Sequence, residues 1–236
     1  MTDPVGSRRT DVRQVVLDTE TTGLEPGRGH RIIEIGCIEM KDRRNTGRVL
    51  HYYINPEREI EDDAIEIHGL TADQLEGEPV FEDVADPLID FIRDSEVIIH
   101  NAPFDVAFIN AELSRLGDDW GRLEDYCSVT DTLEMARELH PGQRNSLDAL
   151  CQRYGIDNSH RSLHGALLDA EILLDVFLAL TGGQSSLLLD REEERDTRSG
   201  LQVANPVRRH TSLKIVEPTK EELAAHRRML ERLNRN

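Results

Sequence analysis

The sequence lacks the features that would place the protein in a membrane or stabilise it with disulfides. None of its 236 residues lies in an apolar stretch long enough to cross a bilayer, and residues 1–10 contain no hydrophobic signal segment. The three cysteines cannot all pair, and none stands in a Cys-x-x-Cys metal motif. We therefore expect a cytoplasmic protein whose cysteines remain reduced.

Basic residues are also scarce. Lysine and arginine number 28 against 46 acidic residues, which gives a formal net charge of −18. This balance argues against a protein that holds duplex DNA by neutralising phosphates over a broad surface. It does not exclude an enzyme that meets nucleic acid at one small site, because bound divalent cations supply local positive charge. The charge therefore weighs more against a DNA-binding module than against a nuclease.

Residues 11–183 alternate between strand-like and helix-like patterns, which predicts an α/β domain. Strands are expected at residues 12–19, 31–40, 49–54 and 96–100. A polar turn around Asn45 and Gly47 separates the second strand from the third. Helices are expected after Asn101 and at residues 79–92, 131–140, 146–154 and 165–180.

The composition changes after residue 183. Residues 190–212 are charged and polar and cannot bury enough apolar surface to fold alone. Residues 218–236 regain a helical pattern with a narrow apolar stripe of Leu223, Met229, Leu230 and Leu233. We expect four regions, which are a disordered N-terminus (1–10), a folded domain (11–183), a flexible linker (184–217) and an amphipathic docking helix (218–236).

Asp18 and Glu20 stand two residues apart at the end of the first expected strand. Both carboxylates therefore project from the same face of the sheet. Hard oxygen donors in such a pair suit Mg²⁺ or Mn²⁺, and ligands for catalytic cations collect at the carboxyl ends of α/β strands. The alternative is ordinary, since acids at strand ends are often simply solvated.

Three further residues follow other strands or open other helices. Asp105 falls in the first turn of a helix, where it is either a partner of the helix dipole or a residue that converges with Asp18. His164 and Asp169 would lie ~140° apart on one helix. We therefore expect His164 before the helix start and Asp169 one turn inside it, facing the sheet. There a metal removes the cost of burying a carboxylate, and His164 can take a proton from water. A surface histidine and a surface aspartate remain the alternative.

Three segments in order resemble the three motifs of the DEDDh 3′→5′ exonuclease family: residues 16–24, 100–105 and 164–170. The resemblance is nearest to the proofreading members that serve bacterial DNA polymerase III. It runs through most of residues 11–183 and includes residues 144–151. It implies a ribonuclease-H-like fold with a mixed five-stranded sheet flanked by helices.

Within that family we expect hydrolysis of the terminal phosphodiester with two divalent cations, Mg²⁺ or Mn²⁺. Asp18, Glu20 and Asp169 are expected to hold the first ion. Asp18 would bridge to the second ion, which Asp105 would reach directly or through water. His164 would be the general base that deprotonates the attacking water.

The DNA 3′ terminus is expected to lie against the same residues. The resemblance implies that Asp63 and His68 help to hold the terminal nucleotide. Asp18, Glu20 and Thr21 are expected to contact it as well. Phe104 either stacks on the last bases or belongs to the core.

The tail is expected to bind partners rather than substrate. Residues 184–189 resemble the short peptide with which bacterial replication proteins bind the sliding clamp. Gln184, Leu187 and Leu189 would make that contact weakly, because a terminal phenylalanine is missing. A continuation of the preceding helix is the alternative. In the proofreading members the region of the terminal helix binds the catalytic (α) subunit of the polymerase.

The leading expectation is a replisome-associated proofreading exonuclease that acts near the nucleoid. A DEDDh ribonuclease that trims RNA 3′ ends shares all three motifs, but it needs neither the linker nor the terminal helix. A non-catalytic adaptor between clamp and polymerase has no need for a cluster of mutually repelling acids. An unrelated carboxylate-metal phosphohydrolase is disfavoured by the three ordered motifs.

Overall fold

The computed structural model describes residues 13–159 and 163–182. The expected N-terminus, linker and docking helix lie outside these residues. The same holds for the residues assigned to the clamp and the polymerase, which are Gln184, Leu187, Leu189, Leu223, Met229, Leu230 and Leu233. In the described ranges no helix combines the length and the apolar character that a membrane crossing requires.

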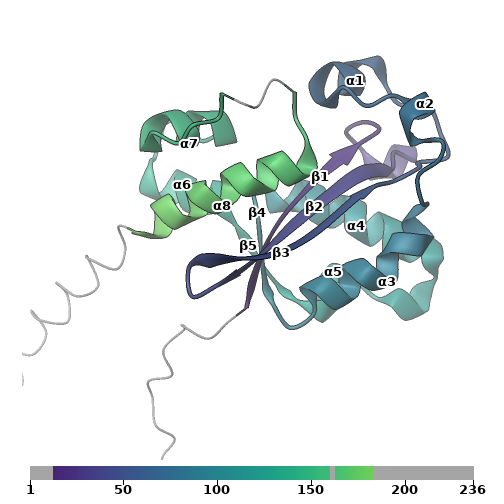
Figure 1. Ribbon diagram of the computed structural model, residues 1–236, viewed down its shortest axis with the longest axis horizontal. Helices are drawn as coiled ribbons and strands as arrows, with labels where there is room; N and C mark the ends of the chain where they lie inside the picture. Colours follow the sequence, from purple (N-terminus) through teal and green to yellow (C-terminus); the bar gives the residue numbers. More distant parts are fainter. Residues whose placement is uncertain (1–12, 160–162, 183–236) are drawn as a thin grey trace, which may run out of the picture. The chain divides into compact units, whose positions relative to one another are not determined.

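A mixed five-stranded sheet forms the centre of the fold (Figure 1), as the resemblance implied. Its order is β3-β2-β1-β4-β5. The pairs β1–β2 and β2–β3 are antiparallel, whereas β1–β4 and β4–β5 are parallel. The strands are β1 (Gln14–Thr21), β2 (Ile32–Lys41), β3 (Arg44–Tyr53), β4 (Glu96–Ile99) and β5 (Ser128–Asp131).

Helices cover both faces of the sheet (Figure 1). One core contains the helices α3 (Phe81–Ile92) and α4 (Ala102–Leu116) and the short α5 (Leu123–Tyr126). The opposite core contains α6 (Thr132–Leu139), α7 (Leu147–Tyr154) and α8 (Ala166–Gly182). The remaining short elements are α1 (Asp62–His68), α2 (Ala72–Leu75), η1 (Pro26–Arg28) and η2 (Asp118–Trp120).

The side chains of β1 pack alternately in the two cores. Val15 and Leu17 pack in the α3–α4 core, whereas Val16 packs in the α8 core. Because side chains alternate along a strand, Asp18 and Glu20 lie on the α8 face with Val16. Thr19 lies with Leu17 on the α4 face. The expectation that the two acids share one face is therefore supported by the packing.

Two expectations about the strands were wrong or incomplete. The hairpin turns at Asp42 and Arg43, whose φ values are 51° and 61°, so Asn45 and Gly47 lie within β3. Positive φ at both central residues is typical of the two-residue turn that matches strand twist. The residue pattern also missed β5, because this strand is mostly polar (Ser128, Thr130 and Asp131), whereas the equally short β4 is an apolar run.

A glycine in β2 allows α8 to lie directly on the sheet. A Cβ atom at Gly36 would come under 3.0 Å from the backbone of Ala166 and Leu167. Gly36 is also the cross-strand partner of Asp18. A glycine inside a strand often marks such a close backbone approach. The contact therefore sets the first turn of α8 against the end of β1 that carries the acids.

Candidate active site

Three of the five predicted catalytic residues form one group, the Glu20–His164–Asp169 cluster. One ligand atom from each of these side chains lies within 4.8 Å of the other two. Glu20 comes from β1, His164 precedes α8, and Asp169 lies in the first turn of α8. His164 Nδ1 is 3.2 Å from Asp169 Oδ2. The sequence motifs at the two ends of the domain thus meet at one point.

Burial differs sharply within this cluster. Asp169 is 3% exposed and Glu20 is 9% exposed, whereas the His164 side chain is 44% exposed. The acids are therefore held inside the fold, and the imidazole reaches solvent. This division suits a site in which buried carboxylates hold a cation and an accessible base meets water.

Asp105 stands on the other side of the sheet. It lies in the first turn of α4, is 3% exposed and accepts a hydrogen bond of 2.7 Å from Thr19 Oγ1. Among the described residues, neither Asp105 nor Asp18 belongs to the group of mutually close ligand atoms. Both are nevertheless tied to the cluster, since Asp18 shares the face of Glu20 and Thr19 lies between them in β1.

Burial and, to a smaller extent, the nearby Asp131 carboxylate raise the pKa of Asp105 to about 7. The hydrogen bond from Thr19 acts in the opposite direction without cancelling the effect of burial. An ionised carboxylate at this depth therefore needs a compensating positive charge. A divalent cation is the natural source of that charge at an acidic site.

His68 lies buried beside the segment that carries His164. The His164 backbone N–H donates to the Ile67 carbonyl at 3.0 Å, which connects this segment to α1. His68 Nδ1 accepts from the Leu70 backbone N–H at 3.0 Å, so its proton is placed on Nε2. No hydrogen-bond partner for that buried Nε2 exists within the described residues. Burial lowers the pKa of His68 and His164 lowers it further, while the Thr21 backbone acts in the opposite direction.

The other residues expected to contact substrate have varied environments. Thr21 is buried, and its hydroxyl donates to the Gly23 carbonyl at 2.7 Å. Asp63 is exposed in the first turn of α1. Phe104 is half-buried, and its ring centroid lies 4.9 Å from that of Phe108. Phe104 therefore packs on the core and also presents part of its ring to solvent.

The sequence analysis did not identify His30 and Glu34, which pack beside the residues of the site. His30 is buried, with Nδ1 3.1 Å from Thr22 Oγ1 and Nε2 3.2 Å from Glu61 Oε1. Its ring fills the space that a side chain at Gly23 would need, which fixes the turn after Glu20. Glu34 pairs across the strands with Glu20 and binds His51 Nε2 at 2.8 Å. Two features of the apolar strand 32–40 could have pointed to this part of the site. The strand contains a glycine, Gly36, and an acid, Glu34.

The donor set of this site fits a divalent cation. Glu20 and Asp169 offer carboxylate oxygens that lie within 4.8 Å of each other and of an imidazole nitrogen of His164. Asp105 and Asp169 are both buried acids at helix N-termini, and the dipoles of α4 and α8 favour their charge only in part. The residues therefore suit a bound cation better than a site without one.

Known proteins resemble this chain over most of its length. The profile of the exonuclease family matches residues 15–177. DNA polymerase III subunit epsilon of Haemophilus influenzae is 47% identical over 237 residues, covering 94% of this chain and 91% of that protein. The subunit epsilon of Escherichia coli strain K12 is 47% identical over 224 residues, covering 93% and 92%. The solved structure of exonuclease X in complex with 5′ overhanging duplex DNA has the same fold, with a TM-score of 0.58 and 23% identity over 73% of this chain and 93% of that one.

Asp105→Asn should stabilise the protein when divalent cations are removed. The carboxyl pKa is about 7 in the folded state and about 3.9 in an unfolded chain. Ionisation of Asp105 therefore lowers the free energy of unfolding of the wild-type protein as the pH rises from about 4 to about 7. Above about pH 7 the loss is complete. In EDTA at pH 8 the free energy of unfolding of the variant should exceed that of wild type by about 1–4 kcal/mol. At pH 5 this difference should be smaller.

Urea unfolding at both pH values measures this difference, and the exposed Asp90→Asn on α3 is the matched control. Asn keeps an oxygen that can accept from Thr19, so the hydrogen bond survives. Saturating Mg²⁺ should shrink the advantage of Asp105→Asn, because the cation then compensates the wild-type carboxylate. A variant that is less stable than wild type at pH 8 in EDTA would contradict this electrostatic account.

Proposed function

The chain belongs to the exonuclease family, and from that premise we propose that it is the proofreading subunit of a bacterial DNA polymerase III. It would remove mismatched nucleotides from the 3′ end of DNA by hydrolysing the terminal phosphodiester. The observation that carries this proposal is the Glu20–His164–Asp169 cluster, in which the first and third motifs meet. Similarity to epsilon subunits over 94% of the chain, beyond residues 15–177, supports a role within the polymerase.

The exonuclease family implies the use of divalent metal ions. We assign this chain two ions, Mg²⁺ or Mn²⁺, because its ligands are mainly carboxylate oxygens. Asp18, Glu20 and Asp169 would hold one ion. Asp18 would also serve the second, with Asp105 acting directly or through water. When bound, the ions would orient the attacking water and stabilise the charge on the leaving 3′ oxygen.

His164 is the residue best placed to move the proton. If Nδ1 donates to Asp169 across 3.2 Å, the Nε2 lone pair is the one that accepts a proton from water. Asp169 would then orient the imidazole as well as contribute a carboxylate to the ion. The proton taken by His164 would pass to the leaving 3′ oxygen, and the product is a nucleoside 5′-monophosphate. General-base catalysis of this kind contributes about 10²–10⁴-fold to a rate.

Residues around α1 would hold the terminal nucleotide. Within the described residues the buried His68 Nε2–H has no hydrogen bond of normal geometry, and an oxygen of the nucleotide would provide one. The Thr21 backbone lies beside the same imidazole. Asp63 would approach from the first turn of α1, and the exposed part of Phe104 would stack on the last base.

The tail would bring this site to its substrate. We assign residues 218–236 to the catalytic subunit of the polymerase and residues 184–189 to a weak contact with the sliding clamp. The apolar stripe Leu223, Met229, Leu230 and Leu233 and the residues Gln184, Leu187 and Leu189 support these roles. A tether raises the local concentration of nuclease at the primer end, which a chain of net charge −18 would not reach by its own attraction to DNA. The protein would then be located with the replisome in the cytoplasm.

Asp18→Asn and His164→Ala should each abolish proofreading without unfolding the domain. On a primer with a mismatched 3′ nucleotide in Mg²⁺, release of the terminal nucleotide should fall at least about 100-fold in either variant. The reason is that one variant loses a cation ligand and the other loses the base. Asp90→Asn makes the same charge change as Asp18→Asn at an exposed position and should act like wild type.

The measurement is single-turnover release of the labelled terminal nucleotide, with circular dichroism to verify the fold. An RNA strand of the same sequence is run in parallel, because a ribonuclease would degrade it faster than the DNA. Wild-type rates from Asp18→Asn or His164→Ala would remove these residues from the mechanism.

Deletion of residues 184–236 should separate hydrolysis from association. The truncated protein should cleave free single-stranded oligonucleotides at the wild-type rate, because the cluster lies within residues 20–169. It should no longer co-purify with the polymerase catalytic subunit. In the full chain, Leu223→Glu with Leu230→Glu should have the same effect on co-purification, whereas Gln184→Ala should leave it intact. Retained association of the truncated protein would disprove the docking role.

A further inference from the structure

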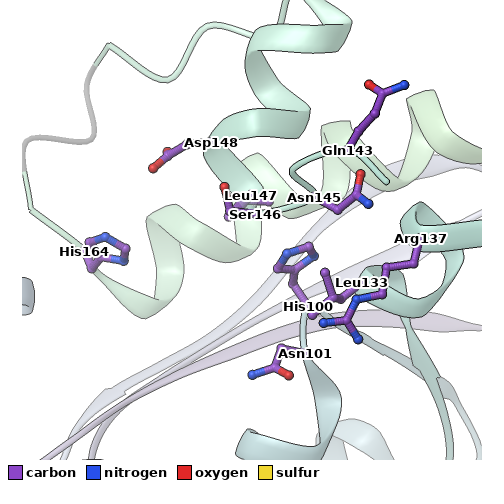
Figure 2. Close-up of a pocket in the computed structure, with 10 residues that line it drawn as sticks. All are labelled: His100, Asn101, Leu133, Arg137, Gln143, Asn145, Ser146, Leu147, Asp148 and His164. Atoms are coloured by element: carbon purple, nitrogen blue, oxygen red, sulfur yellow. The ribbon is translucent and has the colours of Figure 1, made fainter. Parts of the chain in front are cut away.

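A cavity beside the Glu20–His164–Asp169 cluster has a volume of about 680 Å³. His164 is one of its lining residues, so the cavity opens next to the proposed base. Residue 143 and residues 145–148, at the start of α7 and just before it, line another side (Figure 2). Asn101 from the start of α4 and Arg137 from α6 line a third side. The cavity therefore extends from His164 into the space between α4, α6 and the start of α7.

Arg137 is the one arginine among the described residues that line this cavity. It lies in the last turn of α6 and is exposed. No carboxylate within the described residues forms an ion pair with it. In Figure 2 its guanidinium is directed toward His100 and Asn101. The cavity thus holds a planar group with several N–H donors that suits a phosphate.

The backbone around Asn101 is held in an uncommon conformation. Its φ of 66° is in the left-handed region, which costs energy for a residue other than glycine. Asp131 Oδ1 accepts from the Asn101 backbone N–H at 3.0 Å and from the Leu133 N–H at 2.8 Å. One carboxylate therefore fixes both Asn101 and the start of the helix that carries Arg137. Such outliers concentrate at binding sites, and this one presents a carboxamide to the cavity.

The wall formed by residue 143 and residues 145–148 is mostly polar, and hydrogen bonds hold it in place. Asn145 is 7% exposed, its Oδ1 accepts from Arg153 at 3.0 Å, and its Nδ2 donates to the His140 carbonyl at 3.3 Å. Gln143 is exposed at the cavity and offers a side-chain amide. Asp148 is the acid of this lining; its Oδ1 accepts from Asn158, and Figure 2 shows it on the side of His164, away from Arg137. The end of the cavity at Arg137 is therefore the one suited to an anion.

We propose that this cavity holds a phosphodiester of the substrate strand, one upstream of the bond that is cleaved. Arg137 is the charged contact, and Asn101 donates a hydrogen bond from its amide. The inference rests on the proposed function, since it places the scissile bond at the cluster next to His164. The lining contains no Phe, Tyr or Trp among the described residues, so it fits the backbone of the strand better than a stacked base.

The test is Arg137→Gln assayed on a single-stranded hexadeoxynucleotide. A charge-assisted contact to phosphate corresponds to about a 10-fold loss in kcat/KM when the charge is removed. Placing one uncharged methylphosphonate at each of the three linkages upstream of the scissile bond should slow wild type about 10-fold at one of these positions. Arg137→Gln should show no further loss at that position, because the two changes remove the same contact.

A second substrate separates this inference from the function on which it rests. The p-nitrophenyl ester of thymidine 5′-monophosphate has a scissile phosphodiester but no upstream phosphate. Wild type and Arg137→Gln should hydrolyse it at similar rates. Arg115→Gln is the matched control, because it removes the same charge from the last turn of α4, about 20 Å along that helix from Asn101.

The inference is overturned if Arg137→Gln cleaves the hexanucleotide as fast as wild type. It is also overturned if the methylphosphonate slows Arg137→Gln by the same factor as it slows wild type. An equal loss on the ester also overturns it, since Arg137 would then affect the site itself. A wild-type protein that hydrolyses neither substrate in Mg²⁺ or Mn²⁺ would refute the proposed function first, and this inference with it.

Discussion

The contact between the first turn of α8 and β2 is the constraint on which the site depends. A side chain at position 36 would collide with the backbone of Ala166 and Leu167, so glycine there allows the helix to lie directly on the sheet. Gly36 pairs with Asp18, and Glu34 pairs with Glu20 two residues further along. The close approach therefore brings Asp169 and His164 from the end of the domain to the acids of its first strand.

Electrostatics then decides what the assembled residues can do. Glu20, Asp105 and Asp169 are each at most 9% exposed, and burial raises the pKa of Asp105 to about 7. The dipoles of α4 and α8 relieve only part of that cost. A divalent cation would offset more of the free-energy cost of burying these carboxylates. Binding of the cation would therefore stabilise the fold as well as enable the chemistry of the site. The guanidinium of Arg137 in the neighbouring cavity, which forms no ion pair within the part of the chain that the structure describes, would then provide positive charge for the strand itself.

Much of this arrangement followed from the sequence, because it depends on local periodicity. Asp18 and Glu20 share a face since strands repeat every two residues, and Asp169 lies inside a helix that begins after His164. The place of Asp105 on the α4 face, bonded to Thr19, depends on tertiary packing that no local pattern encodes. The turn at Asp42 and Arg43 was missed because both residues adopt positive φ without being glycine. The strand β5 was missed because its residues are mostly polar, whereas the equally short β4 is an apolar run.

The central claim is that the approach of α8 at Gly36 creates the cation site. Calorimetric titration of the metal-free protein with Mn²⁺ tests it most directly, using wild type, Gly36→Ala and Gly77→Ala. No atom lies within 4 Å of a Cβ at Gly77, so that variant controls for the added methyl group. Wild type and Gly77→Ala should bind Mn²⁺ alike, whereas Gly36→Ala, checked to be folded by circular dichroism, should bind about 10-fold more weakly or worse. Equal Mn²⁺ affinity in a folded Gly36→Ala protein would contradict the account.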